Sequence, residues 1–310
     1  MHPTETHQLT IAFKDPTLPH IVQFKDDFKN WLIGIGEETF VEGALDNLFE
    51  DPSYEVTADE QYSDLGGGLQ PLFVYKYDLQ HLEKLKQQID AQFSDSIDTD
   101  ITSLTTESWM EGWKESFKPI RSARFYLYPP WIQDEIPAGL IPIVIEPGMA
   151  FGTGQHATTV LCMEAIETYF DKATSLDRFL DVGTGTGILA IAAKKLGFKY
   201  AMGTDIDSDA IIASRDNIRE NDCEMELIQG SIPEGQAPFD MVVANIIFFV
   251  LKQIIGDLAA QVQPGGLLIL SGLLDEEARE MEEYSRRAGL SLESEATRDD
   301  WAAQVYRKPV

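Results

Sequence analysis

Cysteine and long apolar runs are scarce in this sequence. Its 310 residues include two cysteines, Cys162 and Cys223, which are far apart and stand beside no histidine pair. They provide neither a disulfide framework nor the ligand spacing of a zinc site, so no metal is predicted and a reducing cytoplasm is favoured. The longest apolar stretches, such as residues 266–270, fall far short of the roughly 20 residues of a membrane helix. The first residues also lack the basic and apolar segments of a secretion signal.

Basic residues are scarce as well. The 24 lysines and arginines are outnumbered by 52 aspartates and glutamates, so the formal net charge is -28. Such a chain repels phosphate backbones, which argues against direct binding of nucleic acid and favours a basic protein as partner. Simple solubility, or adaptation to salt, explains the charge equally well, and both interpretations stay open.

The length predicts two domains. Residues 1–95 have the mixed pattern of a small α+β domain of ferredoxin-like type, which we expect to recognise the substrate. The elements expected there are strands at 9–13 and 72–77, helices at 21–33 and 79–93, and a weaker strand near 54–57. Another weaker strand is expected near 101–104, just beyond this range. Residues 96–123 are expected to be a linker. Its aromatic residues Trp109, Trp113 and Phe117, spaced by four, predict an interdomain helix.

Residues 124–310 alternate between strand and helix patterns. Right-handed crossovers between such strands produce a doubly wound, mostly parallel sheet, which is a Rossmann-like α/β fold. Two further strand patterns at 290–297 and 302–307 favour an antiparallel hairpin at the end of this sheet. A seven-strand methyltransferase sheet ends in this way.

A glycine-rich turn follows the first strand of this sheet. Gly183 and Gly185 lie between a buried strand at 178–183 and a helix at 188–196, where glycine lets the backbone approach a ligand closely. Asp205 ends the next strand, about 20 residues on, at the spacing of an acidic side chain that meets ribose hydroxyls. A glycine turn that serves only packing is the simpler alternative, but such a turn does not require a carboxylate at the end of the next strand.

The spacing of the glycines separates two cofactors. A dinucleotide-binding turn has the pattern G-x-G-x-x-G, and its third glycine is replaced here by Ile188. The observed G-x-G-x-G suits S-adenosylmethionine, which has no pyrophosphate, and Asp181 just before the turn is placed to face the ammonium group of that cofactor. A nucleotide-binding oxidoreductase is therefore disfavoured.

Asn245 stands at the carboxyl end of a strand at 241–244, at the edge where α/β sheets bind ligands. Its side-chain amide could orient a nucleophilic nitrogen beside a methyl donor, so it is the candidate catalytic residue. Amino-methyltransferases often have Asn-Pro-Pro-Tyr here, and this chain has Asn-Ile-Ile-Phe. Capping of the helix that begins near residue 247 is an alternative role for this asparagine.

Several motifs in residues 107–273 resemble those of the PrmA family, which methylates ribosomal protein eleven of the large subunit. The motifs are Glu-Pro-Gly-Met-Ala-Phe-Gly-Thr-Gly-Gln-His-Ala-Thr-Thr at 146–159, Trp-Met-Glu-Gly-Trp-Lys-Glu-Ser-Phe-Lys-Pro at 109–119, Val-Ala-Asn-Ile at 243–246 and Gly-Gly-Leu-Leu-Ile-Leu-Ser-Gly at 265–272. The resemblance implies cofactor contacts at Thr159, Gly183, Asp205 and Asn245, with Phe151 lining the same pocket.

The predicted function is therefore methylation of amines on a basic ribosomal protein: lysine side chains and, as an open possibility, an α-amine. Desolvation and the cofactor's positive sulfur both favour the neutral, nucleophilic lysine, so no strong base is required. His156 is interpreted as a packed or capping residue rather than a base. The alternatives are a lysine methyltransferase for a non-ribosomal protein and a non-catalytic assembly factor. Among oligomeric states, a monomer is favoured.

Overall fold

The computed structural model divides the chain into two compact units, Met1–Ser116 and Phe117–Val310. It describes residues 5–14, 21–34, 37, 40–42, 71–105, 118–132, 135–146, 152–170 and 177–310. The strand expected at 54–57 and the aromatic helix expected within the linker lie outside these ranges, so both stay predictions.

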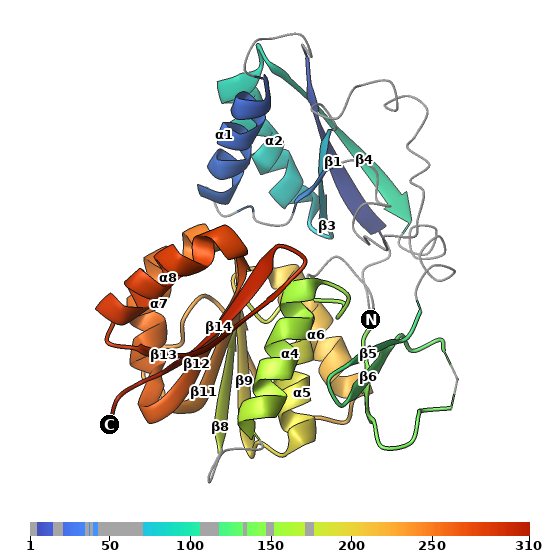
Figure 1. Cartoon of the computed structure of the whole chain (residues 1–310). Coiled ribbons are helices and arrows are strands. Elements are labelled where there is room, and N and C mark those ends of the chain that lie inside the picture. The colour runs from blue at the N-terminus through green and yellow to red at the C-terminus, as the bar shows by residue number, and fades with distance from the viewer. Residues whose placement is uncertain are drawn as a thin grey trace. The chain divides into compact units, whose positions relative to one another are not determined.

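The first unit has the predicted ferredoxin-like topology (Figure 1). Its described strands form one antiparallel sheet in the order β2-β3-β1-β4, and with the described helices they follow the β-α-β-β-α-β sequence. Helix α2 begins at a clear signal, because the Asp78 carboxylate accepts a hydrogen bond from the Gln80 amide. The elements are β1 (Glu5–Phe13), α1 (Ile21–Gly34), β2 (Phe40–Glu42), β3 (Leu72–Lys76), α2 (Leu79–Phe93) and β4 (Ile97–Thr105).

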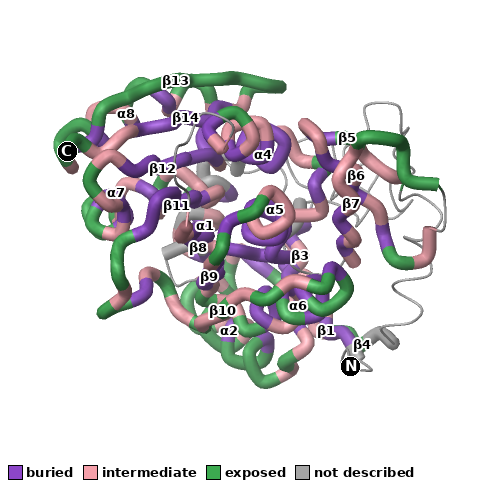
Figure 2. Tube along the Cα trace, turned by 90° about the horizontal axis from the view of Figure 1, so that it is seen from below, coloured by how far each residue is buried: buried purple, intermediate pink, exposed green. Residues whose placement is uncertain are grey.

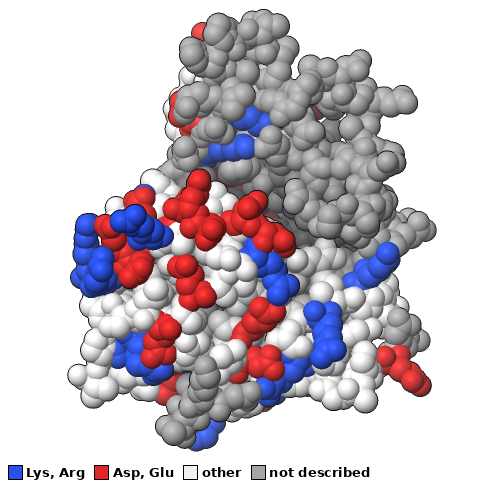
Figure 3. Space-filling model, viewed as in Figure 1, with Lys and Arg blue, Asp and Glu red and all other residues white. Residues whose placement is uncertain are grey.

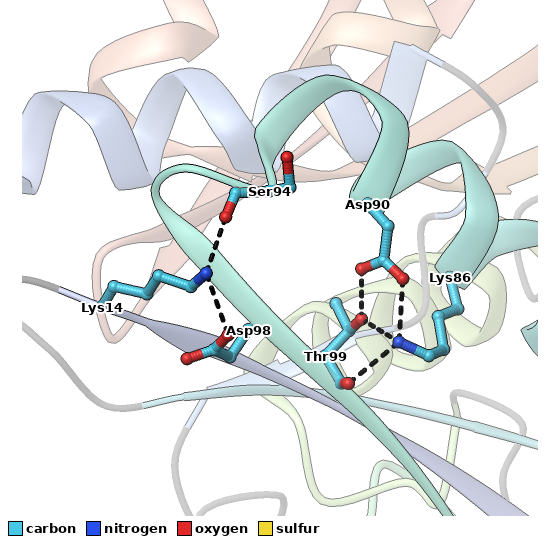
Figure 4. Close-up of polar contacts among 6 residues, drawn as sticks. All are labelled: Lys14, Lys86, Asp90, Ser94, Asp98 and Thr99. Atoms are coloured by element: carbon cyan, nitrogen blue, oxygen red, sulfur yellow. Dashed lines mark hydrogen bonds and ion pairs between the residues drawn. The ribbon is translucent and has the colours of Figure 1, made fainter.

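Strand β4 begins at Ile97, within the residues expected to be a linker, and includes the weaker strand expected near 101–104. It pairs with β1 along nine residues, so it is part of the first unit's sheet. Polar contacts join it to α2 as well (Figure 4): Lys86 Nζ, which lies 2.8 Å from Asp90 Oδ2 on the same helix, donates to Thr99 Oγ1 at 2.6 Å. The polar residues 94–100 are typical of a loop, but an edge strand such as β4 tolerates polar side chains.

The second unit contains the predicted seven-stranded sheet, in the order β10-β9-β8-β11-β12-β14-β13. The first five strands are parallel, and β14 lies antiparallel between β12 and β13, which confirms the expected ending. The strands are β8 (Arg178–Val182), β9 (Tyr200–Asp205), β10 (Glu226–Gln229), β11 (Phe239–Asn245), β12 (Val262–Leu274), β13 (Ser291–Arg298) and β14 (Trp301–Arg307).

Helices cover both faces of this sheet. Alternate residues of β8 and β11 enter two separate apolar cores: Phe179 and Val243 pack with α4 and α5, whereas Leu180 and Val242 pack with α7 and α8. Strands buried on both faces have nearly continuous apolar sequences, which explains why they were recognised from the sequence. Figure 2 shows the central strands buried and β13 exposed along its length. The helices are α4 (Ala157–Phe170), α5 (Ile188–Leu196), α6 (Ser208–Glu220), α7 (Phe248–Gln261) and α8 (Asp275–Arg287).

A three-stranded sheet precedes the seven-stranded one and was not predicted. It consists of β5 (Ile120–Ser122), β6 (Phe125–Tyr128) and β7 (Ile141–Val144), in that order. Its inward side chains join the core of α4 and α5. Strands of three or four residues leave too short a pattern to recognise. Within the described residues, no helix has the length and apolar character needed to cross a membrane.

Candidate active site

The glycine turn joins β8 to α5 at the carboxyl edge of the sheet. Gly183, Gly185 and Gly187 have φ angles of +70°, +54° and +82°, in the left-handed region that residues with a β-carbon rarely adopt. The amides of Gly183 and Thr184 both donate to the Thr204 carbonyl on β9, at 2.8 and 2.9 Å. These bonds anchor the turn to the neighbouring strand, so its shape is set before any ligand binds.

The carboxylate of Asp205 reinforces the turn from the end of β9. Its Oδ2 accepts a hydrogen bond from the Gly185 amide at 2.9 Å, and its Oδ1 accepts one from the Asp207 amide at 3.0 Å. The structure therefore brings Asp205 together with the turn, as the spacing of 20 residues predicts. The second role of this carboxylate, support of the turn itself, could not be predicted from residue spacing.

Asp181 is fully buried at the end of β8. Its Oδ2 accepts a hydrogen bond from Thr184 Oγ1 at 2.8 Å, whereas its Oδ1 accepts none of standard geometry from the described residues. Burial raises the pKa of Asp181 from 3.8 to about 7, because a desolvated carboxylate is costly, while the Thr184 hydrogen bond opposes this rise. An unsatisfied buried oxygen of this kind favours a cationic ligand nearby.

Residues 152–154, from the motif at 146–159, pack directly on the glycine turn. Thr186 Oγ1 donates to the Gly152 carbonyl at 2.6 Å. A Cβ at Gly152 would lie 2.9 Å from Thr186 Oγ1, and one at Gly154 would lie 2.3 Å from Leu127 and 3.2 Å from Ile188. Both glycines also have positive φ. The Gly-Thr-Gly sequence is therefore required by close packing around the turn.

Two buried asparagines, Asn217 on α6 and Asn221 at the C-cap of that helix, hold the segment that leads into this motif. Asn217 Oδ1 accepts from the Glu146 amide and its Nδ2 donates to the Thr186 carbonyl, each at 2.9 Å. Asn221 exchanges two hydrogen bonds with the backbone of Val144. Of the two, Asn217 is the one that connects this segment to the glycine turn. No motif in the sequence indicated either residue, because asparagines on a helix are usually exposed.

Replacing Asn217 with alanine is expected to lower the free energy of unfolding by about 2–4 kcal/mol, since it leaves two buried backbone groups unpaired. It should also weaken binding of the expected nucleoside cofactor. The matched control is Asn221→Ala, which should cost similar stability and leave cofactor affinity within about threefold. Urea unfolding and calorimetry measure the two effects. Equal loss of affinity in both variants would show that α6 only supports the fold.

Asn245 is the last residue of β11 and lies in register with Ser271 of β12. Helix α7 has Ile247, not Asn245, at its N-cap position, and no side-chain hydrogen bond caps it. Asn245 therefore does not cap α7, so the alternative role considered for it from the sequence is wrong. Within the described part of the chain, the half-buried Asn245 side chain makes no hydrogen bond, so its amide can meet a ligand.

The other predicted residues are less closely connected to the turn. Thr159 is buried in the first turn of α4, and its Oγ1 has no hydrogen-bond partner among the described residues. Phe151 lies outside the described residues, so both contacts stay predictions. His156 Nδ1 lies 2.8 Å from Thr158 Oγ1, and its ring packs edge-on against Trp301. These are the contacts of a packed residue at the start of α4.

The fold and its carboxyl edge define an enzyme of the methyltransferase class. Residues 24–309 match the family described as ribosomal protein L11 methyltransferase (PrmA). The chain belongs to this family, as the resemblance in its motifs predicted. It is 44% identical over 208 residues to the ribosomal protein L11 methyltransferase of Geobacter sulfurreducens, covering 67% of this chain and 68% of the relative.

Two further comparisons agree with this assignment. The ribosomal protein L11 methyltransferase of Staphylococcus saprophyticus is 35% identical over 278 residues, covering 85% of this chain and 87% of the relative. Among solved structures, the ribosomal protein L11 methylase of Lactobacillus delbrueckii subsp. bulgaricus matches with a TM-score of 0.57 and 29% identity. That match covers 62% of this chain and 100% of the other.

Proposed function

We propose that the chain transfers methyl groups from S-adenosylmethionine to amines of ribosomal protein L11: its lysine side chains and its α-amine. The observation that carries the proposal is the arrangement at the sheet edge. The Asn245 amide, which makes no hydrogen bond with the described residues, ends β11, and a preformed glycine turn follows the neighbouring strand β8. The proposed substrate follows from the names of the relatives, and the proposed reaction follows from the residues at this edge of the sheet.

The residues present fit S-adenosylmethionine in two respects. The buried Asp181 carboxylate has an oxygen without a hydrogen-bond partner among the described residues, as required to accept the ammonium group. Ile188, which stands where a dinucleotide-binding turn has glycine, is buried and lies close to the backbone of Gly152 and Gly154. The third glycine of a dinucleotide-binding turn allows close packing of helix and strand, and the isoleucine side chain occupies that position here, so the turn favours S-adenosylmethionine over NAD.

Each residue at the edge has a distinct part in the reaction. When bound, S-adenosylmethionine supplies a methyl group on a positively charged sulfur. Asp181 would hold the ammonium group, and Asp205 the ribose hydroxyls. The Asn245 side-chain carbonyl would accept a hydrogen bond from the substrate amine and align its lone pair with the methyl group. Positioning of this kind supplies a large part of the rate when no strong base is needed.

The substrate amine has to be neutral to react. A lysine with a pKa near 10.4 is neutral in only about one molecule in a few thousand at pH 7. Removal from water and the nearby positive sulfur both lower that pKa.

In Figure 3, acidic side chains are spread over the visible face of the second unit with lysines and arginines among them. The net charge of -28 therefore acts as a general attraction for a basic protein.

Mass spectrometry of ribosomal proteins tests this function directly. L11 from cells that lack the chain should have lost its methyl groups, and the purified chain with S-adenosylmethionine should restore them in vitro. Wild-type cells and the Asn245→Ala variant are the controls. Unchanged L11 methylation would reject the proposed substrate, and loss of methylation on a different protein would identify a related lysine methyltransferase. Tight binding of NAD but not of S-adenosylmethionine would reject the cofactor.

A further inference from the structure

Ile246, the residue after Asn245, is enclosed between Gly183 of the glycine turn and Gly272 of β12. Strand β11 lies between β8 and β12 in the sheet (Figure 2), so a residue at its end has the glycine turn on one side and β12 on the other. On the first side, a Cβ added to Gly183 would lie 2.7 Å from Cγ1 and 2.9 Å from Cδ1 of Ile246. The isoleucine side chain therefore rests directly on the glycine turn.

Gly272 makes the contact on the other side, and it does so with the backbone of Ile246. A Cβ there would lie 2.4 Å from the Ile246 carbonyl oxygen and 2.9 Å from its nitrogen. The pairing of β12 with β14 shifts register between Ser271 and Leu273, and Gly272 has a φ of +83°. A bulge with glycine in this conformation bends a strand locally, and such bulges often lie beside active sites. The Ile246 amide also donates to the Ser271 carbonyl at 3.1 Å.

We infer that Ile246 is a positioning residue: held between Gly183 and Gly272, it sets the place of the Asn245 amide relative to the glycine turn. This inference rests on the proposed function, because it concerns the same site. Contacts on both sides leave the backbone after β11 little freedom to move. The β-branched isoleucine side chain is itself restricted to few rotamers, so it transmits the position of the turn to its neighbour. A displacement of about 1 Å at a reacting group can cost about 100-fold in rate.

Alanine at Gly272 should push the Ile246 backbone away from β12 and displace Asn245. The expected result is a fall in kcat on the order of 100-fold, with Kd for S-adenosylmethionine within about threefold. The matched control is Gly289→Ala, because Gly289 has a φ of +85° and nothing within 4 Å of an added Cβ. This control bears the same backbone strain without the contact, so its kcat should change by less than about twofold.

A double substitution distinguishes positioning from general damage. If Ile246 is held from both sides, Ile246→Ala removes the contact with Gly183 and gives the displaced backbone room. The double variant Gly272→Ala with Ile246→Ala should then be more active than Gly272→Ala alone. Ile246→Ala by itself should lower kcat about tenfold, and Ile246→Val, which keeps a γ-carbon over the turn, should restore most of it. Additive losses in the double variant would overturn the inference, and so would equal effects on kcat and Kd in Ile246→Ala.

A readout without catalysis separates this inference from the proposed function. In the free full-length chain, the side-chain amide signals of Asn245 in a nitrogen–proton correlation spectrum should move in Gly272→Ala and Ile246→Ala but not in Gly289→Ala. If they move and the wild-type chain methylates no ribosomal protein, the positioning holds and the proposed function fails. If they do not move, the positioning inference is wrong whatever the activity.

Discussion

Replacing Asn245 with alanine is expected to lower kcat for methyl transfer by about 100-fold, with Kd for S-adenosylmethionine within about threefold. The amide ends β11 and makes no hydrogen bond within the described part of the chain. Its loss therefore removes an interaction with the reacting amine and leaves the fold intact. Steady-state kinetics on L11, calorimetry with the cofactor and thermal unfolding together measure the three quantities.

The variant Asn245→Asp is the control for this prediction, because it has the same shape and keeps an oxygen that accepts a hydrogen bond. Its negative charge raises the pKa of a nearby lysine, so a smaller fraction of the substrate is neutral at a given pH. We expect intermediate activity and a pH profile of kcat/KM shifted to higher pH. Equal losses in kcat and in cofactor affinity for Asn245→Ala would show that the residue is a cofactor ligand and not a guide for the amine.

The second large effect is expected at Asp181. Its pKa rises from 3.8 to about 7 on folding, so the folded chain retains a proton that the unfolded chain has lost. This carboxyl group therefore favours the folded state at low pH, and its contribution is lost as the pH rises from about 4 to 7. The free energy of unfolding of Asp181→Asn, minus that of wild type, should therefore rise by about 3 kcal/mol from pH 5 to pH 8. Urea unfolding at both pH values measures the gain.

Folding favours the protonated form of Asp181, whereas cofactor binding should favour its charged form. A cationic ammonium beside Asp181 favours the carboxylate, so binding below pH 7 should release a proton and affinity should increase as the pH rises to about 7. Asp181→Asn should weaken binding roughly 100-fold at pH 8, because the ammonium loses its buried partner. Calorimetry in two buffers with different ionisation enthalpies detects the proton. Binding without proton release, and with unchanged affinity in the variant, would exclude Asp181 as the ammonium partner.

The Asp181 and Asn245 predictions differ in what they test. Asp181→Asn trades affinity for stability, which is the usual compromise where a buried charge serves binding. Asn245→Ala should change neither stability nor affinity by much, because its side chain is half-buried and makes no hydrogen bond with the described residues. Measured together, the two variants separate binding of the methyl donor from alignment of the amine.

Much of this protein could be predicted from local sequence patterns. Helix α2 was predicted with its observed bounds, and the buried strand β8 and the turn after it were recognised from apolar residues followed by alternating glycines. Short strands such as β5 were missed, and of the polar strand β4 only residues 101–104 were expected to form a strand. Their stability comes from pairing with distant strands, as β4 pairs with β1, and that pairing leaves no mark on the local pattern.

The fold class, the family and the glycine turn could be recognised from the amino-acid sequence, because hydrophobic periodicity and glycine spacing are local properties of a chain. Which side chains contact one another became known only from the folded chain. Asn217 links the segment at Glu146 to Thr186, and Ile246 lies between Gly183 and Gly272. These contacts depend on the order of strands in the sheet and on a bulge in β12, since strand pairing brings together residues whose separation along the chain has no regular spacing.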